Sequence, residues 1–353
     1  LSKQAHYDFS LRTMIAILLH AGTIKNSVIA NDEHALLKIA IGDMIRPKLV
    51  SNDEDIFEAI INSIFLEGKH EDRGDSIDRD EIFRKEIKEE ILIKNLCGSP
   101  YLVNQIILIY NYMKIKHGIM LVGESLSGKS TSMKLLQSLS KRLAKKNMKE
   151  FTDIHVTTLY PKSIELDELY GKQILTAQSG EQSYIEGLLP YHIKDLCNLS
   201  KDEKTRLVKW LCLDGPIDSL WIESMNTLLD ETKMLSLPSG YRINLKSDVK
   251  IIFETENLVM ATPATVSRVG LIFFEADKLS WFPIARNWLD KKKNDKNWYE
   301  LIAKWFDKYT YGILNELKDN NLQYLINYHD NHIIISFIRI YESFMDEIEQ
   351  ARQ

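Results

Sequence analysis

The stretch Gly123-Glu124-Ser125-Leu126-Ser127-Gly128-Lys129-Ser130 matches the pattern G-x-x-x-x-G-K-S of a phosphate-binding loop. The two glycines let the backbone curl so that successive N–H groups face a phosphate. The lysine adds a positive charge near the β- and γ-phosphates, and the hydroxyl of the next serine can coordinate Mg²⁺. We therefore predict a nucleotide site made of Gly123, Glu124, Ser125, Leu126, Ser127, Gly128, Lys129, Ser130 and Thr131.

The sequence on either side of this loop agrees with the motif. Residues 118–122 are an apolar run typical of a buried parallel strand. Residues 129–148 carry apolar side chains at helical spacing, with lysines on the other face. Strand, loop and helix in this order are what the motif requires, and an ordinary Gly/Ser turn is the alternative.

Composition limits the classes of protein and partner. A chain of 353 residues predicts two or three domains, and 44% hydrophobic with 27% charged residues is typical of a globular protein. The net charge of −5 gives no electrostatic support for nucleic-acid binding, and no apolar run reaches the length of a membrane span. We expect neither nucleic acid nor membrane as a partner.

The cysteines and the first residues give two further expectations. Cys97, Cys197 and Cys212 are far apart and form no C-x-x-C pair, which indicates neither a zinc site nor a disulfide framework. Such cysteine usage suits a reducing compartment. The start at residues 1–4 is no signal peptide and lacks methionine, so we expect a piece of a longer protein.

The order of predicted elements indicates an α/β fold. Helical patterns separate the apolar runs, which favours a parallel sheet covered on both faces. Residues 1–65 and 281–353 read as helical, and the charged segment 67–80 is the best linker candidate. Two segments, 173–187 and 234–245, resemble hairpins. The predicted strands are 118–122, 154–157, 210–213, 249–254 and 270–274.

Asp214 is the expected second half of the nucleotide site. It follows the apolar run 210–213, so it would lie at the end of a strand and hold Mg²⁺ through water. The alternative is a turn, since Asp-Gly-Pro is turn chemistry. Hydrolysing P-loop ATPases usually place a glutamate next, but Gly215 has no side chain to act as a base. We predict Mg·ATP binding with poor hydrolysis.

Other nucleotide enzymes fit less well. The GTPase patterns D-x-x-G and N-K-x-D are absent, and nothing identifies an acceptor pocket for a small-molecule kinase. Thr262 and Pro263 predict a short helix that ends at Arg268, where ring ATPases carry an arginine finger that stabilises charge in phosphoryl transfer. Without that context, an arginine at a helix end interacts with the helix dipole.

Four stretches of sequence carry a family resemblance. They are HYDFSLR at 6–12, PKSI with LYG between 161 and 171, LDGPIDSLWIESMNT at 213–227, and ATVSRVG at 264–270. On these stretches the chain resembles the dynein heavy chain of the axonemal type, over nearly its whole length. The resemblance implies the helical lid of the first AAA+ module at 1–68, a linker at 69–81, the large α/β subdomain of the second module at 82–285, and its small all-α lid at 286–353.

The resemblance also implies roles for residues. The second module of the family is regarded as binding ATP stably with little turnover, which agrees with Gly215. Glu254 lies where hydrolysing modules carry a polar sensor, and a carboxylate there repels the triphosphate. Arg268 matches the arginine finger, and Arg12 the lid sensor, of the first module's nucleotide. The two hairpins match inserts that contact the mechanical linker.

Partners and location follow from the same resemblance. They are the other AAA+ modules and the linker of the heavy chain, and, through the parent motor, dynein intermediate and light chains and microtubules. The implied location is the cytoplasm, the cytoskeleton and the axoneme of a cilium or flagellum.

The chain also departs from the family pattern. Glu124 places a carboxylate inside the phosphate loop, which should weaken binding unless it points away. Val269 replaces a usual cysteine, a conservative packing change. The open alternatives are a slowly hydrolysing ATPase module and a nucleotide-free structural module of the ring.

Overall fold

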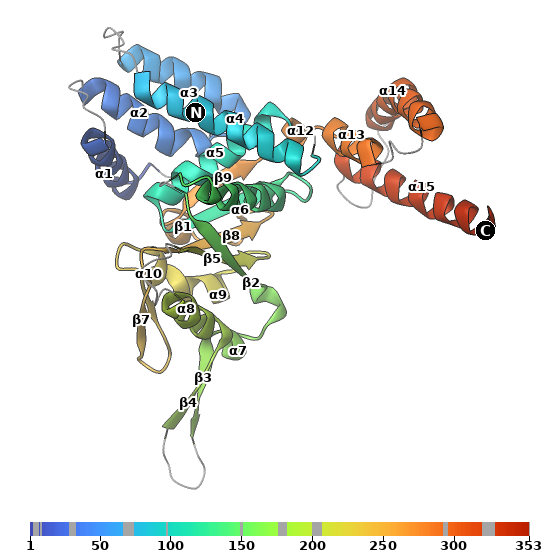
Figure 1. The fold of residues 1–353 in the computed structure, drawn as a ribbon. Coiled ribbons are helices and arrows are strands. Elements are labelled where there is room, and N and C mark those ends of the chain that lie inside the picture. The colour runs from blue at the N-terminus through green and yellow to red at the C-terminus, as the bar shows by residue number, and fades with distance from the viewer. Residues whose placement is uncertain are drawn as a thin grey trace.

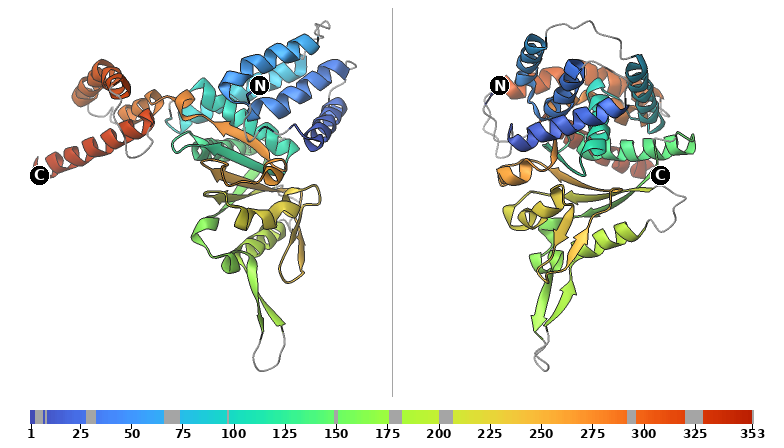
Figure 2. Two further views of the ribbon diagram at one scale, coloured as in Figure 1. Left: turned by 180° about the vertical axis from the view of Figure 1, so that it is seen from behind. Right: turned by 90° about the vertical axis from the view of Figure 1, so that its left-hand side faces the viewer.

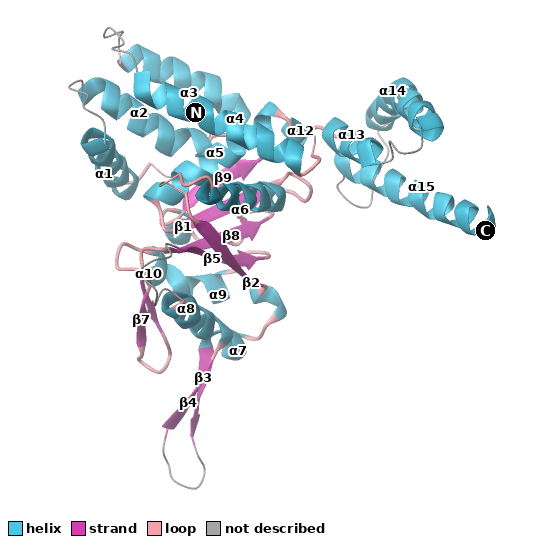
Figure 3. Cartoon of the chain, in the orientation of Figure 1, coloured by secondary structure: helices cyan, strands magenta, loops and turns pink. Residues whose placement is uncertain are grey.

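A five-stranded parallel sheet in the order β2-β5-β8-β1-β9 forms the centre of the computed structural model (Figure 1). Helices flank the sheet on both sides (Figure 3). All five strands predicted from the sequence form, and they pair as a parallel sheet. The strands are β1 (Gly118–Gly123), β2 (Asp153–Leu159), β5 (Leu207–Asp214), β8 (Val249–Thr255) and β9 (Gly270–Phe274). The structure describes residues 1–2, 7, 9–27, 33–65, 74–96, 98–148, 151–175, 182–199, 207–291, 296–319 and 329–352.

Alternate side chains of each strand enter two separate cores, because successive residues of a strand point to opposite faces. Ile119 and Leu121 pack with the helices on one face, and Met120 and Val122 with those on the other. Burial on both faces explains the uninterrupted apolar runs of the sequence. The first face carries α4 (Gly74–Ile93), α5 (Pro100–Ile115) and α6 (Lys129–Lys145), and the second α7 (Leu166–Tyr170), α8 (Leu188–Asn198), α9 (Ser219–Ile222) and α10 (Asn226–Leu229) (Figure 1).

Two antiparallel hairpins extend from the second face, and both confirm the sequence prediction (Figure 2). One pairs β3 (Gly171–Leu175) with β4 (Gln182–Glu186), and its turn lies outside the described residues. The other pairs β6 (Met234–Ser236) with β7 (Arg242–Asn244). Short single-turn helices connect the larger elements: η1 (Arg46–Lys48), η2 (Pro161–Ser163), η3 (Glu223–Met225), α11 (Pro263–Val266) and α12 (Ala276–Leu279).

The N-terminal helices α1 (Leu11–Ser27), α2 (Glu33–Ile45) and α3 (Ser51–Ile64) share a small core of their own. Thr13 and Ile17 of α1 are buried. The apolar stripe that the sequence shows on this helix is instead exposed: Leu11, Met14, Ile15, Leu18 and Leu19 are 44–72% accessible. Helical spacing alone therefore identified the helix but not the face that packs inside this chain.

The segment expected to be a linker contains the start of a helix. Helix α4 begins at Gly74, inside the predicted linker 69–81, while residues 66–73 lie outside the described part. Low hydrophobicity suggested a linker, but aspartate, glutamate, arginine and lysine side chains are compatible with helix. The boundaries of the four predicted segments, 1–68, 69–81, 82–285 and 286–353, stay a prediction.

The C-terminal region is helical, as predicted. It contains α13 (Phe282–Lys291), α14 (Lys296–Asp319) and α15 (Asp330–Arg352), which extend to one side of the sheet (Figure 2). Trp288, Phe306 and Ile334 belong to their shared core, and the Trp288 indole N–H donates to Glu342 at 2.8 Å. Among the described residues, no helix combines the length and apolar character needed to cross a membrane.

Tyr112 joins the N-terminal helices to the sheet. Its buried hydroxyl donates to the carbonyl of Met44 at 2.7 Å, and burial raises the pKa of this phenol above its usual value. The ring lies against Gly270, where an added Cβ would come within 2.4 Å of it. Glycine at the start of β9 therefore makes room for the side chain that fastens α5 to α2.

We expect Tyr112→Phe to lower the free energy of unfolding by about 1–3 kcal/mol, because the buried Met44 carbonyl loses its donor. Urea titration followed by circular dichroism measures this change. Tyr191→Phe, at a tyrosine that is 56% exposed, is the matched control and should change stability little. Equal stabilities of the two variants would show that this hydrogen bond does not fasten the N-terminal helices.

Candidate nucleotide site

The predicted phosphate-binding loop connects the end of β1 to the start of α6. Gly128 is the residue before the helix and has φ of +94°, in the left-handed region that favours glycine. The Lys129 ammonium lies in the mouth of the loop, where it donates to the carbonyls of Gly123 at 2.5 Å and Glu124 at 2.8 Å. Burial lowers the pKa of Lys129, and the charges of nearby carboxylates oppose this shift.

The residues of this loop fit a phosphate group. The Ser127 hydroxyl is buried without a hydrogen-bond partner among the described residues. Lys129 supplies a buried positive charge, and the 17-residue helix α6 directs its N-terminal end toward the loop. Glu124, Ser125, Leu126, Ser130 and Thr131 are exposed. An unsatisfied hydroxyl, a cation and a helix N-terminus are groups that bind phosphate oxygens.

Two carboxylates lie beside the loop at the ends of neighbouring strands. Asp214 and Glu254 are register partners in the pairing of β5 with β8, and β8 lies next to β1. The Ser130 hydroxyl donates to the Glu254 carboxylate. Burial raises the pKa of Glu254, while the hydrogen bond from Ser130 opposes the shift. Ser130, Asp214 and Glu254 therefore offer oxygen ligands of the kind that Mg²⁺ prefers.

The contact of Glu254 with Ser130 is the part of this site that sequence reasoning missed. The sequence pointed to Glu254 only as a group unfavourable for hydrolysis. A signal was present, because Asp214 and Glu254 each come at the end of a predicted strand, and the C-terminal ends of parallel strands share one edge. Which strands are neighbours, however, is a property of the fold that the sequence pattern does not reveal.

Gly215 has a backbone conformation that favours glycine. Its φ is +143°, and its N–H donates to the carbonyl of Glu254 at 3.0 Å. An added Cβ would meet nothing within 4 Å, so the restriction comes from the backbone and not from crowding. The position after Asp214 thus has no side chain to act as a base, and its backbone disfavours one.

The two predicted arginines meet at the opposite edge of the sheet. Arg268 Nε donates to Asp230 Oδ1 at 2.9 Å, and Arg12 Nη2 lies 3.4 Å from the same oxygen. Arg12 Nη1 also donates to the Ser267 hydroxyl at 3.3 Å. The structure therefore brings together Arg12 and Arg268, which are 256 positions apart in sequence, around one shared carboxylate.

The short helix before Arg268 forms as predicted. The Thr262 side chain accepts from the N–H of Thr265 and caps α11, with Pro263 in its first turn. The Arg268 guanidinium also donates to the carbonyl of Ala264. The alternative role of this arginine, interaction with the end of its own helix, is therefore present alongside the pairing with Asp230.

Parallel topology keeps Arg268 away from the phosphate loop of its own chain. Arg268 precedes Gly270, which pairs with Ile119 at the beginning of β1, whereas the loop follows Gly123 at the end of that strand. The six residues of β1 span about 20 Å. Arg268 and the phosphate loop thus lie at opposite edges of the sheet.

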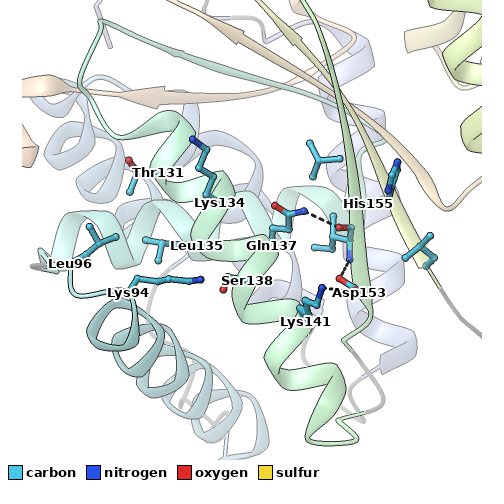
Figure 4. Close-up of a pocket in the computed structure, with 13 residues that line it drawn as sticks. Lys94, Leu96, Thr131, Lys134, Leu135, Gln137, Ser138, Lys141, Asp153 and His155 are labelled. Atoms are coloured by element: carbon cyan, nitrogen blue, oxygen red, sulfur yellow. Dashed lines mark hydrogen bonds and ion pairs between the residues drawn. The ribbon is translucent and has the colours of Figure 1, made fainter.

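A cavity of about 810 Å³ lies elsewhere, beside α6 and the edge strand β2 (Figure 4). Lys94, Lys134, Lys141 and His155 line it, and Thr131 is the one predicted nucleotide-binding residue among its lining. The cavity therefore does not coincide with the mouth of the phosphate loop.

Two of the three cysteines lie in the described part of the chain. Cys197 and Cys212 are buried free thiols, and burial raises the pKa of Cys212 to about 12, while Cys97 lies outside the described residues. No group of three or more His, Cys, Asp or Glu side chains suited to a metal ion occurs within the described ranges.

Comparison with known proteins identifies the family. A family model described as "Hydrolytic ATP binding site of dynein motor region" matches residues 1–130. Over 318 residues the chain is 37% identical to the dynein-1-beta heavy chain of the flagellar inner arm I1 complex of Chlamydomonas reinhardtii, covering 88% of this chain. The chain belongs to the dynein heavy-chain family.

Further relatives extend this dynein match along the chain. Identity is 33% to dynein axonemal heavy chain 2 of Mus musculus over 91% of the chain, and 31% to dynein axonemal heavy chain 3 of Homo sapiens over 100%. The chain spans only 7–8% of the length of these curated relatives. The dynein resemblance and the AAA+ fold class predicted from sequence are thereby confirmed.

We expect Gly215→Ala to lower the free energy of unfolding by about 1–2 kcal/mol, because alanine at this φ is strained even in open space. Chemical denaturation provides the measurement. Gly312→Ala is the matched control, since it also adds a methyl group in open space but lies inside helix α14, where alanine stabilises. If Gly215→Ala leaves the free energy of unfolding unchanged, the backbone at this position does not require glycine.

Proposed function

We propose that this segment contains an ATP-binding AAA+ module of a dynein microtubule motor, which binds Mg·ATP or Mg·ADP with little or no hydrolysis. One observation carries the proposal. The phosphate loop, Asp214 and Glu254 lie at the same edge of the sheet, and Gly215 stands where a hydrolysing ATPase has its catalytic base. The parent motor is an ATPase, and this module's nucleotide serves structure or regulation.

Each residue of the site has a defined task in this proposal. Backbone N–H groups of residues 123–128 and the Lys129 ammonium bind the phosphates. Ser130 contacts Mg²⁺, and Asp214 holds it through water. The metal neutralises phosphate charge when bound. Because Glu254 already accepts from Ser130, the serine lone pairs stay available for the metal.

The description of the matching family does not contradict weak hydrolysis at this loop. That description names a hydrolytic ATP site, but the match ends at Ser130. Asp214, Gly215 and Glu254 all lie beyond it. Gly215 therefore lies outside the matched residues, and it supplies no base for hydrolysis.

The second half of the proposal assigns the arginines to a different nucleotide. Residues 1–68 are proposed as the lid of the preceding module, 69–81 as a connection, 82–285 as the α/β subdomain of this module and 286–353 as its lid. Arg268 would be the finger, and Arg12 the lid sensor, for the preceding module's ATP. Their common partner Asp230 and their distance from the local loop support a shared target outside this site.

The proposed partners are the other AAA+ modules and the linker of the same heavy chain, with dynein intermediate and light chains and microtubules reached through the whole motor. The exposed apolar stripe of α1 suits contact with another part of the heavy chain. The matched relatives carry axonemal or flagellar names, so we place this protein in the cytoskeleton of the axoneme.

We expect the chain to bind fluorescent ATP analogues in Mg²⁺ and to release almost no phosphate in a single-turnover assay. Lys129→Ala should weaken binding at least tenfold, because it removes the charge that faces the phosphates. Lys145→Ala, at an exposed lysine in the last turn of the same helix α6, is the matched control. Turnover at the rate of active ring ATPases would rule out a structural or regulatory site. If neither the parent nor Lys129→Ala binds nucleotide, the module is a nucleotide-free one.

The arginine role makes a separate prediction. Arg268→Ala should leave nucleotide binding by this chain unchanged, yet slow ATP hydrolysis on the order of 10³-fold in a longer heavy chain that includes the preceding module. Steady-state phosphate release by that longer chain measures the effect. Arg339→Ala, at an exposed arginine of α15, is the matched control. Unchanged hydrolysis after Arg268→Ala would remove the finger role while leaving the local ATP site intact.

A further inference from the structure

The C-terminal helices contact the phosphate loop at two successive places. His329, just before α15, pairs through Nε2 with the carboxylate of Glu124. Two residues later, Asn331 Nδ2 donates to the carbonyl of Leu126 at 3.5 Å. The first turn of α15 therefore lies directly over the loop that follows β1.

The His329 ring lies between two carboxylates from different elements. Its Nδ1 is 3.3 Å from Asp277 Oδ1 of α12, while its Nε2 contacts Glu124 of the phosphate loop. The His329 side chain is 26% exposed, the Glu124 side chain 51% and the Asp277 side chain 90%. His329 is thus the most enclosed of these three side chains, and it connects the C-terminal helices to the phosphate loop.

Asn331 makes the same connection without charge. It is 2% exposed, so its amide is held by the packing around the start of α15. Its partner Leu126 has φ of +62°, a conformation unusual for leucine, and Leu126 lies between the two glycines of the loop. The contact fixes where α15 sits relative to the loop backbone.

We propose that His329 is a positioning residue of this nucleotide site, which holds the Glu124 carboxylate against the C-terminal helices and away from the phosphates. The inference rests on the proposed function in one respect, that the loop binds the phosphates of a nucleotide. It explains how a loop with an acidic residue in its second position can still accept a polyphosphate.

The physical reason is charge. A carboxylate released into the mouth of the loop would repel a triphosphate and compete for the Lys129 ammonium, whose charge the phosphates need. Paired with an imidazole that also contacts Asp277, the Glu124 carboxylate is kept on the helical side. The position of α15 and the affinity of the loop for nucleotide are thereby coupled, since each requires the same contact.

A double-mutant cycle on this chain tests the proposal through fluorescent-ATP titration in Mg²⁺. We expect His329→Ala to weaken binding by about three- to tenfold, because Glu124 is then free to approach the phosphates. Glu124→Gln alone should bind nucleotide more tightly than the parent, because the loop then carries one negative charge fewer. In the double variant His329→Ala with Glu124→Gln, the loss should disappear, because no carboxylate remains to be held.

Control variants separate positioning from damage to the fold. His192→Ala, at a histidine of α8 on the other face of the sheet, should leave affinity unchanged. Thermal unfolding of each variant checks that the helical region is still folded. An equal loss of affinity after His329→Ala with and without Glu124→Gln would overturn the positioning role and leave the ATP site standing. Failure of the parent itself to bind nucleotide would overturn both proposals.

Discussion

The parallel pairing of β1 with β8 on one side and β9 on the other is the constraint on which both sites depend. It places the loop after Gly123 beside Glu254, and through β5 beside Asp214, at one edge of the sheet. It places Arg268, which precedes β9, at the other edge. Because a parallel sheet separates the beginnings of its strands from their ends, one module can bind a nucleotide at one edge and present an arginine at the other.

At the edge of the sheet that carries the proposed nucleotide site, the balance of charge limits what that site can bind and do. Lys129 is buried among the fields of several carboxylates, and burial lowers its pKa while those carboxylates favour its charge. Burial and the neighbouring Asp214 raise the pKa of Glu254. A bound polyphosphate would bring further negative charge, and a divalent cation between it and these carboxylates would relieve the repulsion. Gly215, directly after Asp214, supplies no side chain that could act as a base.

Much of this fold follows from local sequence, and most of what the sequence did not predict depends on tertiary contacts. Apolar runs located the five strands, and the turn residues located both hairpins. Helical spacing could not tell that the stripe of Leu11 and Leu18 faces outward, because the choice of face depends on what α2 and the rest of the chain offer. The contact of Ser130 with Glu254, and that of His329 with Glu124, join residues 124 and 205 positions apart, a distance at which no local pattern carries information.

Asp230 shows how two like charges can be kept at one place. Arg12 and Arg268 would repel each other, yet both approach the same carboxylate oxygen, at 3.4 and 2.9 Å. The Arg268 side chain is only 18% exposed and also donates to a backbone carbonyl, whereas Arg12 is 44% exposed. Arg268 is therefore the more firmly held of the pair, and Arg12 the freer one. A phosphate arriving at this edge would compete with Asp230 for Arg12 first, since less burial and longer contacts hold that side chain.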